Sequence, residues 1–318
     1  MFQLSFPIPV SKDKIQLSDN VISIGSCFAE SIGGNLKDYK FNVTTNPFGT
    51  IYNPISLSQL LSNEIEEGAV IEQNGIFYHW HAHGEVSALN KASLDTMIAS
   101  KRSLFQDTLI SADWLIITLG SAFAYRLKDS GRVVANCHKV PQTRFTKELL
   151  AVEDVIQKLG NTFELMSSRN PKLKIILTVS PVRHIRDGLI ENNRSKARLI
   201  EVVQSLSWSS DRIKYFPAFE IMIDELRDYR FYSKDRVHPS NEAIEYIWSR
   251  FCETYFDEET SLFVKEWQSI RSALQHRPFH PQSKEHQAFI RSTVSKLKAL
   301  SSKVDVSAEV SLLESQLL

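Results

Sequence analysis

The sequence predicts an α/β fold of three layers, α/β/α, with a central parallel sheet of about five strands and a C-terminal helical appendage. Over roughly the first 258 residues, short runs of β-branched and aliphatic residues alternate with segments of helical periodicity. Beyond that point the pattern changes to long polar helices. With 318 residues, 42% of them hydrophobic, the chain is long enough to bury a large core.

Five short apolar runs are the expected strands of this sheet. They are residues 21–24, 42–45, 114–119, 174–179 and 213–216. The first, third and fourth runs end at Gly25, at Gly120 and at Ser180-Pro181. Ligands of open α/β sheets bind at the carboxyl ends of the strands, so we expect function to concentrate there.

The segments between the strands predict helices. Residues 28–36 indicate a short helix that stops near Gly33-Gly34, and Pro239 suits the start of a later helix. Amphipathic patterns predict further helices over residues 55–63, 152–168, 194–207, 218–226 and 241–255. Residues 71–90 differ, because a turn at Gly75 and an alternating pattern favour a small hairpin or insertion over a core strand.

Residues 259–318 are expected to extend a catalytic domain formed by residues 1–258. The two prolines of Arg277-Pro278-Phe279-His280-Pro281 prevent a single continuous helix. The last stretch, residues 285–318, suits a docking helix, a dimerisation helix or a partly frayed tail. A homodimer formed through these helices is therefore one expectation.

Charge and composition exclude several classes of protein. Lysine plus arginine and aspartate plus glutamate each total 37, so no net field attracts nucleic acid or an anionic membrane. The start of the chain lacks an export signal, and no window approaches the roughly 18 apolar residues of a membrane span. We expect a cytoplasmic protein. Cys27, Cys137 and Cys252 have no CxxC spacing, which argues against a disulfide framework or a zinc site.

The first chemistry-bearing feature is Gly25-Ser26-Cys27, which lies between an apolar strand and a helix. A nucleophile at such a turn is held at the carboxyl edge of the sheet, where helix N–H groups lower a thiol pKa and stabilise an oxyanion. The alternative is structural. Gly25 then permits the turn, Ser26 caps the helix, and Cys27 is a small buried hydrophobe.

The second feature is Asp235-Arg236-Val237-His238-Pro239, ahead of the last helix of the α/β region. An aspartate three residues before a histidine can orient the imidazole, whose other nitrogen then faces a nucleophile. Alternatively, the two side chains cap the following helix or pair with surface arginines. An early nucleophile turn combined with a late DxxH is more specific than either part.

Together these residues resemble the SGNH, or GDSL-like, hydrolases, and Gly25-Ser26-Cys27-Phe28-Ala29 resembles the eponymous motif of the GSCFA family. The resemblance covers about residues 1–258 and implies a flavodoxin-like fold with acyl-transfer chemistry. In the superfamily's Gly-Asp-Ser turn the serine stands two places after the glycine. That register favours Cys27 as nucleophile, although a shift of one residue restores Ser26.

The resemblance also implies an oxyanion hole. The glycine donor expected after the second strand fits Gly49. Superfamily members commonly carry Gly-x-Asn-Asp after the third strand, but this chain has Gly120-Ser121-Ala122 and lacks the asparagine. Its substitutes are Ser121, Asn46 or Asn136. Without one, the loss would be about 2.7–4 kcal/mol of transition-state stabilisation.

Other polar residues are candidates for the walls of the pocket. Asn136 and His138 follow the third strand, but their segment equally suits a solvated loop. After the fourth strand, Arg183 or His184 suits a substrate anion by the same resemblance. Lys196 could take that role too, although Arg194, Lys196 and Arg198 most simply form a solvated helix face. The three imidazoles of the 79–83 segment suit a lid or substrate wall better than a metal site.

The sequence thus predicts an SGNH-like enzyme that cleaves ester or thioester bonds through a covalent acyl-enzyme, without metal or cofactor. The expected substrate is a small-molecule or saccharide acyl ester. One alternative is an O-acyltransferase that modifies a saccharide, which a thiol nucleophile favours. The other is a catalytically weakened domain that binds a glycan or acyl ligand.

Overall fold

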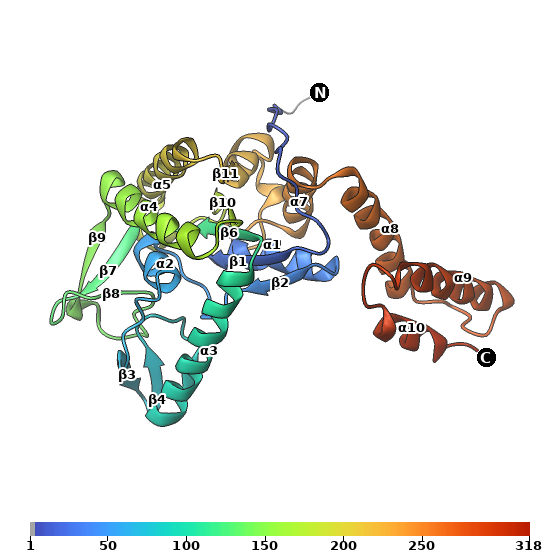
Figure 1. The fold of residues 1–318 in the computed structure, drawn as a ribbon, viewed down its shortest axis with the longest axis horizontal. Helices are drawn as coiled ribbons and strands as arrows, with labels where there is room; N and C mark the ends of the chain where they lie inside the picture. The colour runs from blue at the N-terminus through green and yellow to red at the C-terminus, as the bar shows by residue number, and fades with distance from the viewer. Residues whose placement is uncertain (1–3) are drawn as a thin grey trace.

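Five parallel strands form the central sheet of the computed structural model, which describes residues 4–318 (Figure 1). The spatial order is β11-β10-β6-β1-β2. The strands are β1 (Asn20–Gly25), β2 (Asn42–Thr45), β6 (Trp114–Leu119), β10 (Lys174–Val179) and β11 (Ile213–Phe216). All five predicted strands are confirmed, as is the three-layer arrangement. β1, β6 and β10 are adjacent, so their carboxyl ends share one edge.

Alternate residues of the buried strands face two separate layers of helices. Leu115 and Ile117 of β6 belong to one hydrophobic cluster, whereas Trp114 and Ile116 belong to another. The first cluster includes buried residues of α2 (Pro54–Leu61), α3 (Lys91–Ser111), α4 (Val152–Arg169) and α5 (Leu189–Ser209). The second includes α1 (Cys27–Asp38) and α7 (Asn241–Tyr255). The sheet is therefore covered on both faces, as parallel sheets require.

The predicted stop of the first helix at Gly33-Gly34 is wrong. Helix α1 continues through both glycines to Asp38. A Cβ atom on Gly33 would lie 2.3 Å from Oγ1 of Thr45, whereas one on Gly34 would meet nothing within 4 Å. Gly33 is there because α1 packs closely against β2, and the glycine does not end the helix.

Other helix predictions differ at their ends. Helix α5 begins at Leu189, five residues before the predicted start at residue 194. The segment predicted as one helix over residues 218–226 is a short α6 (Ala218–Glu220) followed by a π-helix, η3 (Ile221–Glu225). Helix α3 was not predicted, because its buried residues are few among many polar ones.

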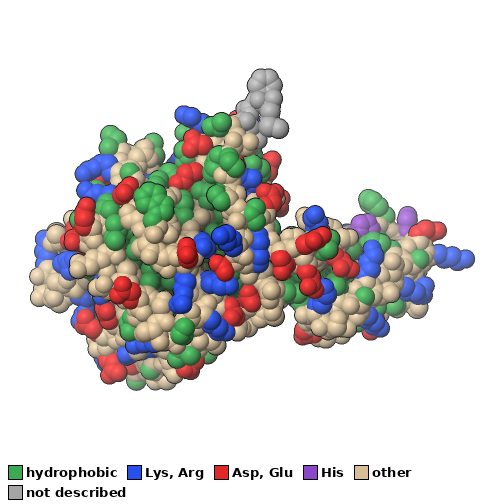
Figure 2. Space-filling view, turned by 45° about the horizontal axis from the view of Figure 1, so that its top comes forward, with side chains coloured by type: hydrophobic (Ala, Val, Ile, Leu, Met, Phe, Trp, Pro, Cys, Tyr) green, Lys and Arg blue, Asp and Glu red, His purple; other side chains and the backbone are tan. Residues whose placement is uncertain are grey.

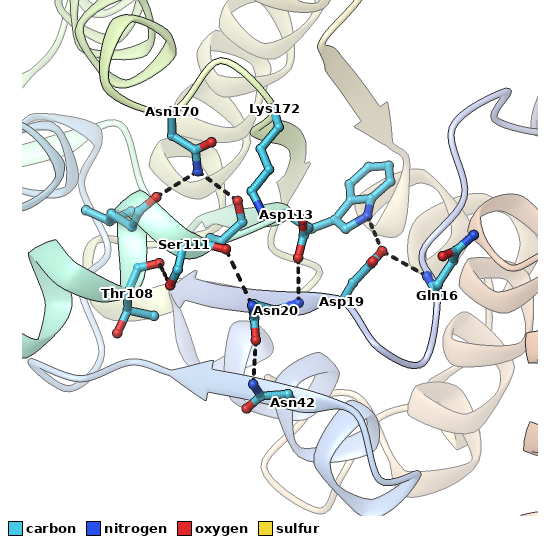
Figure 3. A network of polar contacts seen from close by, with 12 residues as sticks. Gln16, Asp19, Asn20, Asn42, Thr108, Ser111, Asp113, Asn170 and Lys172 are labelled. Carbon is cyan, nitrogen blue, oxygen red and sulfur yellow. Dashed lines mark hydrogen bonds and ion pairs between the residues drawn. The ribbon is translucent and has the colours of Figure 1, made fainter. Parts of the chain in front are cut away.

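Polar contacts hold the amino edge of the sheet (Figure 3). The Asp113 carboxylate accepts hydrogen bonds from the Asn20 N–H at 2.9 Å and from Lys172 Nζ at 2.8 Å. The Asp19 carboxylate accepts one from Trp114 Nε1 at 3.0 Å. These contacts connect the starts of β1 and β6 to neighbouring loops. The carboxylates at this edge therefore serve the fold.

Two small antiparallel sheets stand beside the central one. The hairpin predicted within residues 71–90 is confirmed as β3 (Val70–Gln73) and β4 (Ile76–His79), with the short strand β5 (Ser87–Ala88) added. Asn74 and Gly75 both have positive φ, which suits a two-residue hairpin turn. The second sheet was not predicted; it comprises β7 (Phe123–Leu127), β8 (Val133–Val134) and β9 (Phe145–Leu149).

The C-terminal helices form a lobe that projects from the body of the molecule (Figures 1 and 2). They are α8 (Glu258–Gln275), α9 (Lys284–Leu300) and α10 (Ser307–Glu314), with the expected break between α8 and α9. Trp267 is buried, and its Nε1 donates to the Asp38 carbonyl at 2.8 Å at the end of α1. Over residues 4–318, no helix has both the length and the apolar character that a membrane span requires.

Candidate functional site

The turn between β1 and α1 is fixed against the neighbouring strand β6. Gly25 has φ +130°, and a Cβ atom there would lie 2.1 Å from the Thr118 carbonyl oxygen. That same oxygen accepts the N–H of Ser26 at 3.0 Å. Only glycine can hold this conformation so close to another backbone. Ser26 and Cys27 are therefore held at the carboxyl edge of the sheet.

Ser26 and Cys27 differ in exposure. The side chain of Ser26 is buried, and its residue is only 1% exposed. Ser26 is in the N-cap position, yet its hydroxyl makes no cap hydrogen bond and has no partner among residues 4–318. Cys27, the first residue of α1, is partly exposed. Of the two, Cys27 is the residue that a substrate can reach, and the capping role expected of Ser26 is absent.

The groups around Cys27 shift the pKa of its thiol in opposite directions. Burial and the nearby Glu30 carboxylate raise the pKa of the thiol above its usual value. The N–H groups of Cys27 and Phe28 at the helix start act in the other direction, as does the Lys196 ammonium. The thiol is therefore protonated at rest and needs a base to become a nucleophile.

Asn46 and Gly49 hold the turn in place. Asn46 Oδ1 accepts the Gly25 N–H at 2.9 Å, and its Nδ2 donates to the Glu30 carboxylate at 3.2 Å. The Gly49 N–H donates to the Asn46 carbonyl at 2.8 Å. Both groups considered as oxyanion donors are thus engaged in the loop after β2.

Gly120 and Ser121 are engaged in a similar way. Their N–H groups both donate to the Tyr52 carbonyl at 3.0 Å. Ser121 Oγ accepts the Phe123 N–H at 3.1 Å and lies 3.3 Å from Ser195 Oγ on α5. Ser121, the expected substitute for the missing asparagine, therefore bonds within its own loop and to α5.

Asp235 and His238 form a pair on the loop before α7. Asp235 Oδ1 accepts the N–H groups of Val237 and His238, and Oδ2 lies 2.6 Å from His238 Nδ1. The hydrogen bond to His238 lowers the pKa of Asp235 to about 2, so the carboxylate is ionised and Nδ1 carries the proton. Helix α7 is capped by Ser240. The structural alternative, in which Asp235 and His238 cap that helix, therefore does not hold.

Arg183 connects this loop to the end of β10. Its N–H donates to the Val237 carbonyl at 3.2 Å, and its guanidinium donates to the Arg236 carbonyl at 3.1 Å. The guanidinium also lies 4.0 Å from the centre of the Tyr232 ring. Arg183 thus positions the loop that carries His238.

The two halves of the candidate site follow strands that end at the same edge of the sheet. Cys27 follows β1, and Arg183 holds the His238 loop near the end of β10. One strand, β6, separates them, which corresponds to about 10 Å between strand axes. Within the described part of the chain, His238 Nε2 forms no hydrogen bond, and none joins His238 to Cys27 or Ser26.

Lys196 departs from its main sequence interpretation as a solvated side chain. It is only 2% exposed, and its Nζ donates to the Gly120 carbonyl at 2.8 Å and to the Ser180 carbonyl at 2.7 Å. Burial lowers its pKa to about 7. The sequence signal was present, since residues 195, 199, 202 and 206 of α5 are buried and position 196 adjoins that stripe.

Tyr52 is a site residue that was not among the sequence predictions. Its ring packs on Gly120, where an added Cβ atom would lie 2.9 Å from Tyr52 Cδ1 and 3.1 Å from the Ser26 Cβ. Burial, with a smaller effect from Cys27, raises the pKa of the phenol to about 12. The hydroxyl is therefore a protonated hydrogen-bond donor beside the turn. No spacing rule in the sequence indicates it.

Asn136 and His138 pack against the hairpin. Asn136 Oδ1 accepts the His138 N–H at 2.8 Å. His138 is buried, lies 3.0 Å from the His79 carbonyl through Nε2 and stacks on Tyr78 at 4.8 Å. Burial lowers the pKa of His138 to about 4, so the ring is neutral. His138 is thus not the solvent-facing side chain that the loop alternative assumed.

Of the imidazoles of the 79–83 segment, that of His83 packs on the loop after β2, where an added Cβ atom on Gly49 would lie 2.4 Å from the His83 Cβ. His79 and His81 are buried, with ring centres 5.6 Å apart, and His83 lies 3.7 Å from the Glu85 carboxylate. Among residues 4–318, no group of three or more His, Cys, Asp or Glu side chains has the geometry to hold a metal ion. His79 lines a cavity of about 830 Å³ between α3 and the hairpin, away from Cys27.

Comparison with family models places these features in a known family. The model of the GSCFA family matches residues 20–251, from the first residue of β1 almost to the end of α7. The model of the GSCFA domain protein, C-terminal domain, matches residues 267–318, which hold the second half of α8 and all of α9 and α10. No curated protein matches the chain. Because the first match alone spans more than half of its length, the chain belongs to the GSCFA family.

Proposed function

We propose that the protein is an SGNH-type enzyme that cleaves ester or thioester bonds through an acyl-enzyme on Cys27. One observation carries the proposal. The sheet edge that presents the partly exposed Cys27 at the start of α1 also carries an Asp235–His238 pair 2.6 Å apart, whose Nε2 is unoccupied within residues 4–318. A nucleophile, a base and a group that orients the base are the parts of a catalytic triad.

In the proposed reaction, His238 Nε2 takes the proton from Cys27 Sγ. The sulfur attacks the acyl carbonyl, and the tetrahedral intermediate collapses as the alcohol or thiol leaves with a proton from His238. Water, or the hydroxyl of an acceptor, then gives its proton to His238 and attacks the thioester; the C–S bond breaks, the acyl product leaves, and the Cys27 sulfur regains the proton from His238. Asp235 holds the imidazole in the tautomer that leaves Nε2 free to act.

Stabilisation of the oxyanion is assigned to groups other than the predicted ones. The first N–H groups of a helix have no partner within it, and those of Cys27 and Phe28 face the sulfur. The Tyr52 hydroxyl is the side-chain donor near the turn, and its pKa of about 12 keeps the proton on it. We therefore assign to Tyr52 the role that asparagine has in the SGNH hydrolases.

Transfer to a saccharide hydroxyl is the form of the reaction that the thiol favours. A thiol exchanges readily with an acyl thioester, which makes a thioester a suitable acyl donor for Cys27. Hydrolysis results when water replaces the acceptor. The raised pKa of Cys27, and the absence within residues 4–318 of a hydrogen bond between Cys27 and His238, favour a second candidate, a glycan- or acyl-binding protein with little turnover.

The test is an assay with a short-chain p-nitrophenyl ester and an acyl thioester. Wild type is compared with Cys27→Ala, Ser26→Ala and His238→Ala, and Cys137→Ala is the matched thiol control. We expect Cys27→Ala and His238→Ala to abolish turnover, while Ser26→Ala and Cys137→Ala retain it. Loss with Ser26→Ala alone would make Ser26 the nucleophile. No turnover by wild type, despite acyl-ligand binding, would favour the binding protein.

A further inference from the structure

Lys196 is a buried amine with neutral partners, and a pKa of about 7 leaves it partly protonated at neutral pH. Its two hydrogen bonds go to the backbone carbonyls of Gly120 and Ser180, and its Nζ lies 5.9 Å from the centre of the Phe219 ring. Within residues 4–318, no carboxylate forms a salt bridge with it. Removing an ammonium from water without a carboxylate partner is strongly unfavourable. A neutral side chain could also donate to the Gly120 and Ser180 carbonyls without that penalty. The charge itself therefore needs an explanation.

The position of this cation relates it to the nucleophile turn. Gly120 and Ser180 are the residues that follow β6 and β10, so Nζ lies at the carboxyl edge of the sheet. An added Cβ atom on Gly120 would lie 3.1 Å from the Ser26 Cβ, which shows that this backbone touches the turn. Lys196 therefore bonds to Gly120, whose backbone contacts the turn that begins α1.

Few other charged groups act on Cys27 or Lys196. The Cys27 thiolate is the group whose charge favours the ammonium, and the ammonium in turn favours the thiolate. The other ionisable groups that act on Cys27 or Lys196 are Glu30, which opposes the thiolate, and the neutral side chains of Tyr52 and His184. No second cation is among the groups that act on the thiol.

We propose that Lys196 is a positioning residue whose buried ammonium, held at the Gly120 and Ser180 carbonyls, forms a long-range ion pair, without direct contact, with the Cys27 thiolate. The proton from Sγ leaves to His238 or to solvent, and the ammonium keeps all three of its protons. In this arrangement the ammonium stabilises the thiolate once the proton has left. The inference rests on the proposed function only in treating Cys27 as the reactive thiol, and the ion pair can be measured without any acyl substrate.

The experiment measures the pH dependence of Cys27 alkylation. In a Cys137→Ser, Cys252→Ala background Cys27 is the one remaining thiol, and its reaction with iodoacetamide follows its ionisation. We expect Lys196→Met to move the midpoint upward by about 1 pH unit or more, as for loss of an adjacent opposite charge. The control, Lys172→Met, removes a lysine at the opposite edge of the sheet and should leave the midpoint in place. An unchanged midpoint in folded Lys196→Met would overturn the proposal.

A second measurement keeps the test decisive if Lys196→Met does not fold. The titration of the Lys196 side chain is followed by NMR in isotope-labelled protein, in wild type and in Cys27→Ala. Since a thiolate beside the ammonium stabilises its charge, Cys27→Ala should lower the titration midpoint of Lys196. Identical midpoints in the two proteins would contradict the ion pair. Because neither readout requires turnover, an inactive wild type would count against the enzyme proposal and leave this one standing.

Discussion

His238 Nδ1 lies 2.6 Å from Asp235 Oδ2, while both side chains are about half exposed at 50% and 47%. The pair is therefore formed before any substrate is present, and Asp235 already fixes the imidazole tautomer. Arg183 and the backbone of the same loop hold it near the end of β10. Among residues 4–318 the pair makes no hydrogen bond to the thiol, so the proposed reaction depends on whether His238 Nε2 can reach Cys27 Sγ.

We expect Asp235→Asn to lower kcat by about 10³- to 10⁴-fold, because the amide favours the wrong imidazole tautomer. The pH profile supplies a check with a definite sign. Asp235 has a pKa of about 2, so it is ionised throughout the ordinary range and cannot produce an acid limb above pH 3. Steady-state kinetics from pH 5 to 9 would measure both effects. A variant as active as wild type would mean that the pair is structural.

Tyr52→Phe should lower kcat by about 10²- to 10³-fold, the usual cost of removing one oxyanion donor. KM should change little, because the hydroxyl is assigned to the developing oxyanion and not to the ground state. With a phenol pKa of about 12, the donor should not be lost below pH 11. Tyr125→Phe, on the partly exposed β7, is the matched control. Equal activity of Tyr52→Phe and wild type would remove Tyr52 from the mechanism.

The sheet was predictable because its strands are contiguous runs of apolar residues, each a local signal. Gly33 misled because a glycine inside a helix has two explanations, a stop or a close contact, and only the position of Thr45 decides between them. The sequence pattern located Cys27 and the Asp235–His238 pair. Tyr52 could not be found in that way, and the contact of Lys196 with Gly120 was not expected, because Gly120 is distant from both residues in the chain.

The two glycines of α1 make a matched pair for stability. Gly33→Ala should destabilise the protein by about 1–3 kcal/mol, because the methyl group would overlap Thr45 and separate α1 from β2. Gly34→Ala meets open space and should stabilise the helix by about 0.5–1 kcal/mol. Chemical denaturation of both variants gives the sign of each change. Equal and favourable effects would mean that α1 and β2 can separate without cost.

The attachment of the C-terminal lobe can be tested at Trp267. This residue is 1% exposed, and Trp267→Ala should cost about 3–5 kcal/mol through lost burial and the lost hydrogen bond to the Asp38 carbonyl. Phe279, which is 98% exposed between α8 and α9, is the control, and Phe279→Ala should leave Tm unchanged. Calorimetry adds a second observable. If the lobe and the α/β body unfold together, Trp267→Ala lowers a single transition, whereas two transitions in the wild type would show that the lobe unfolds on its own.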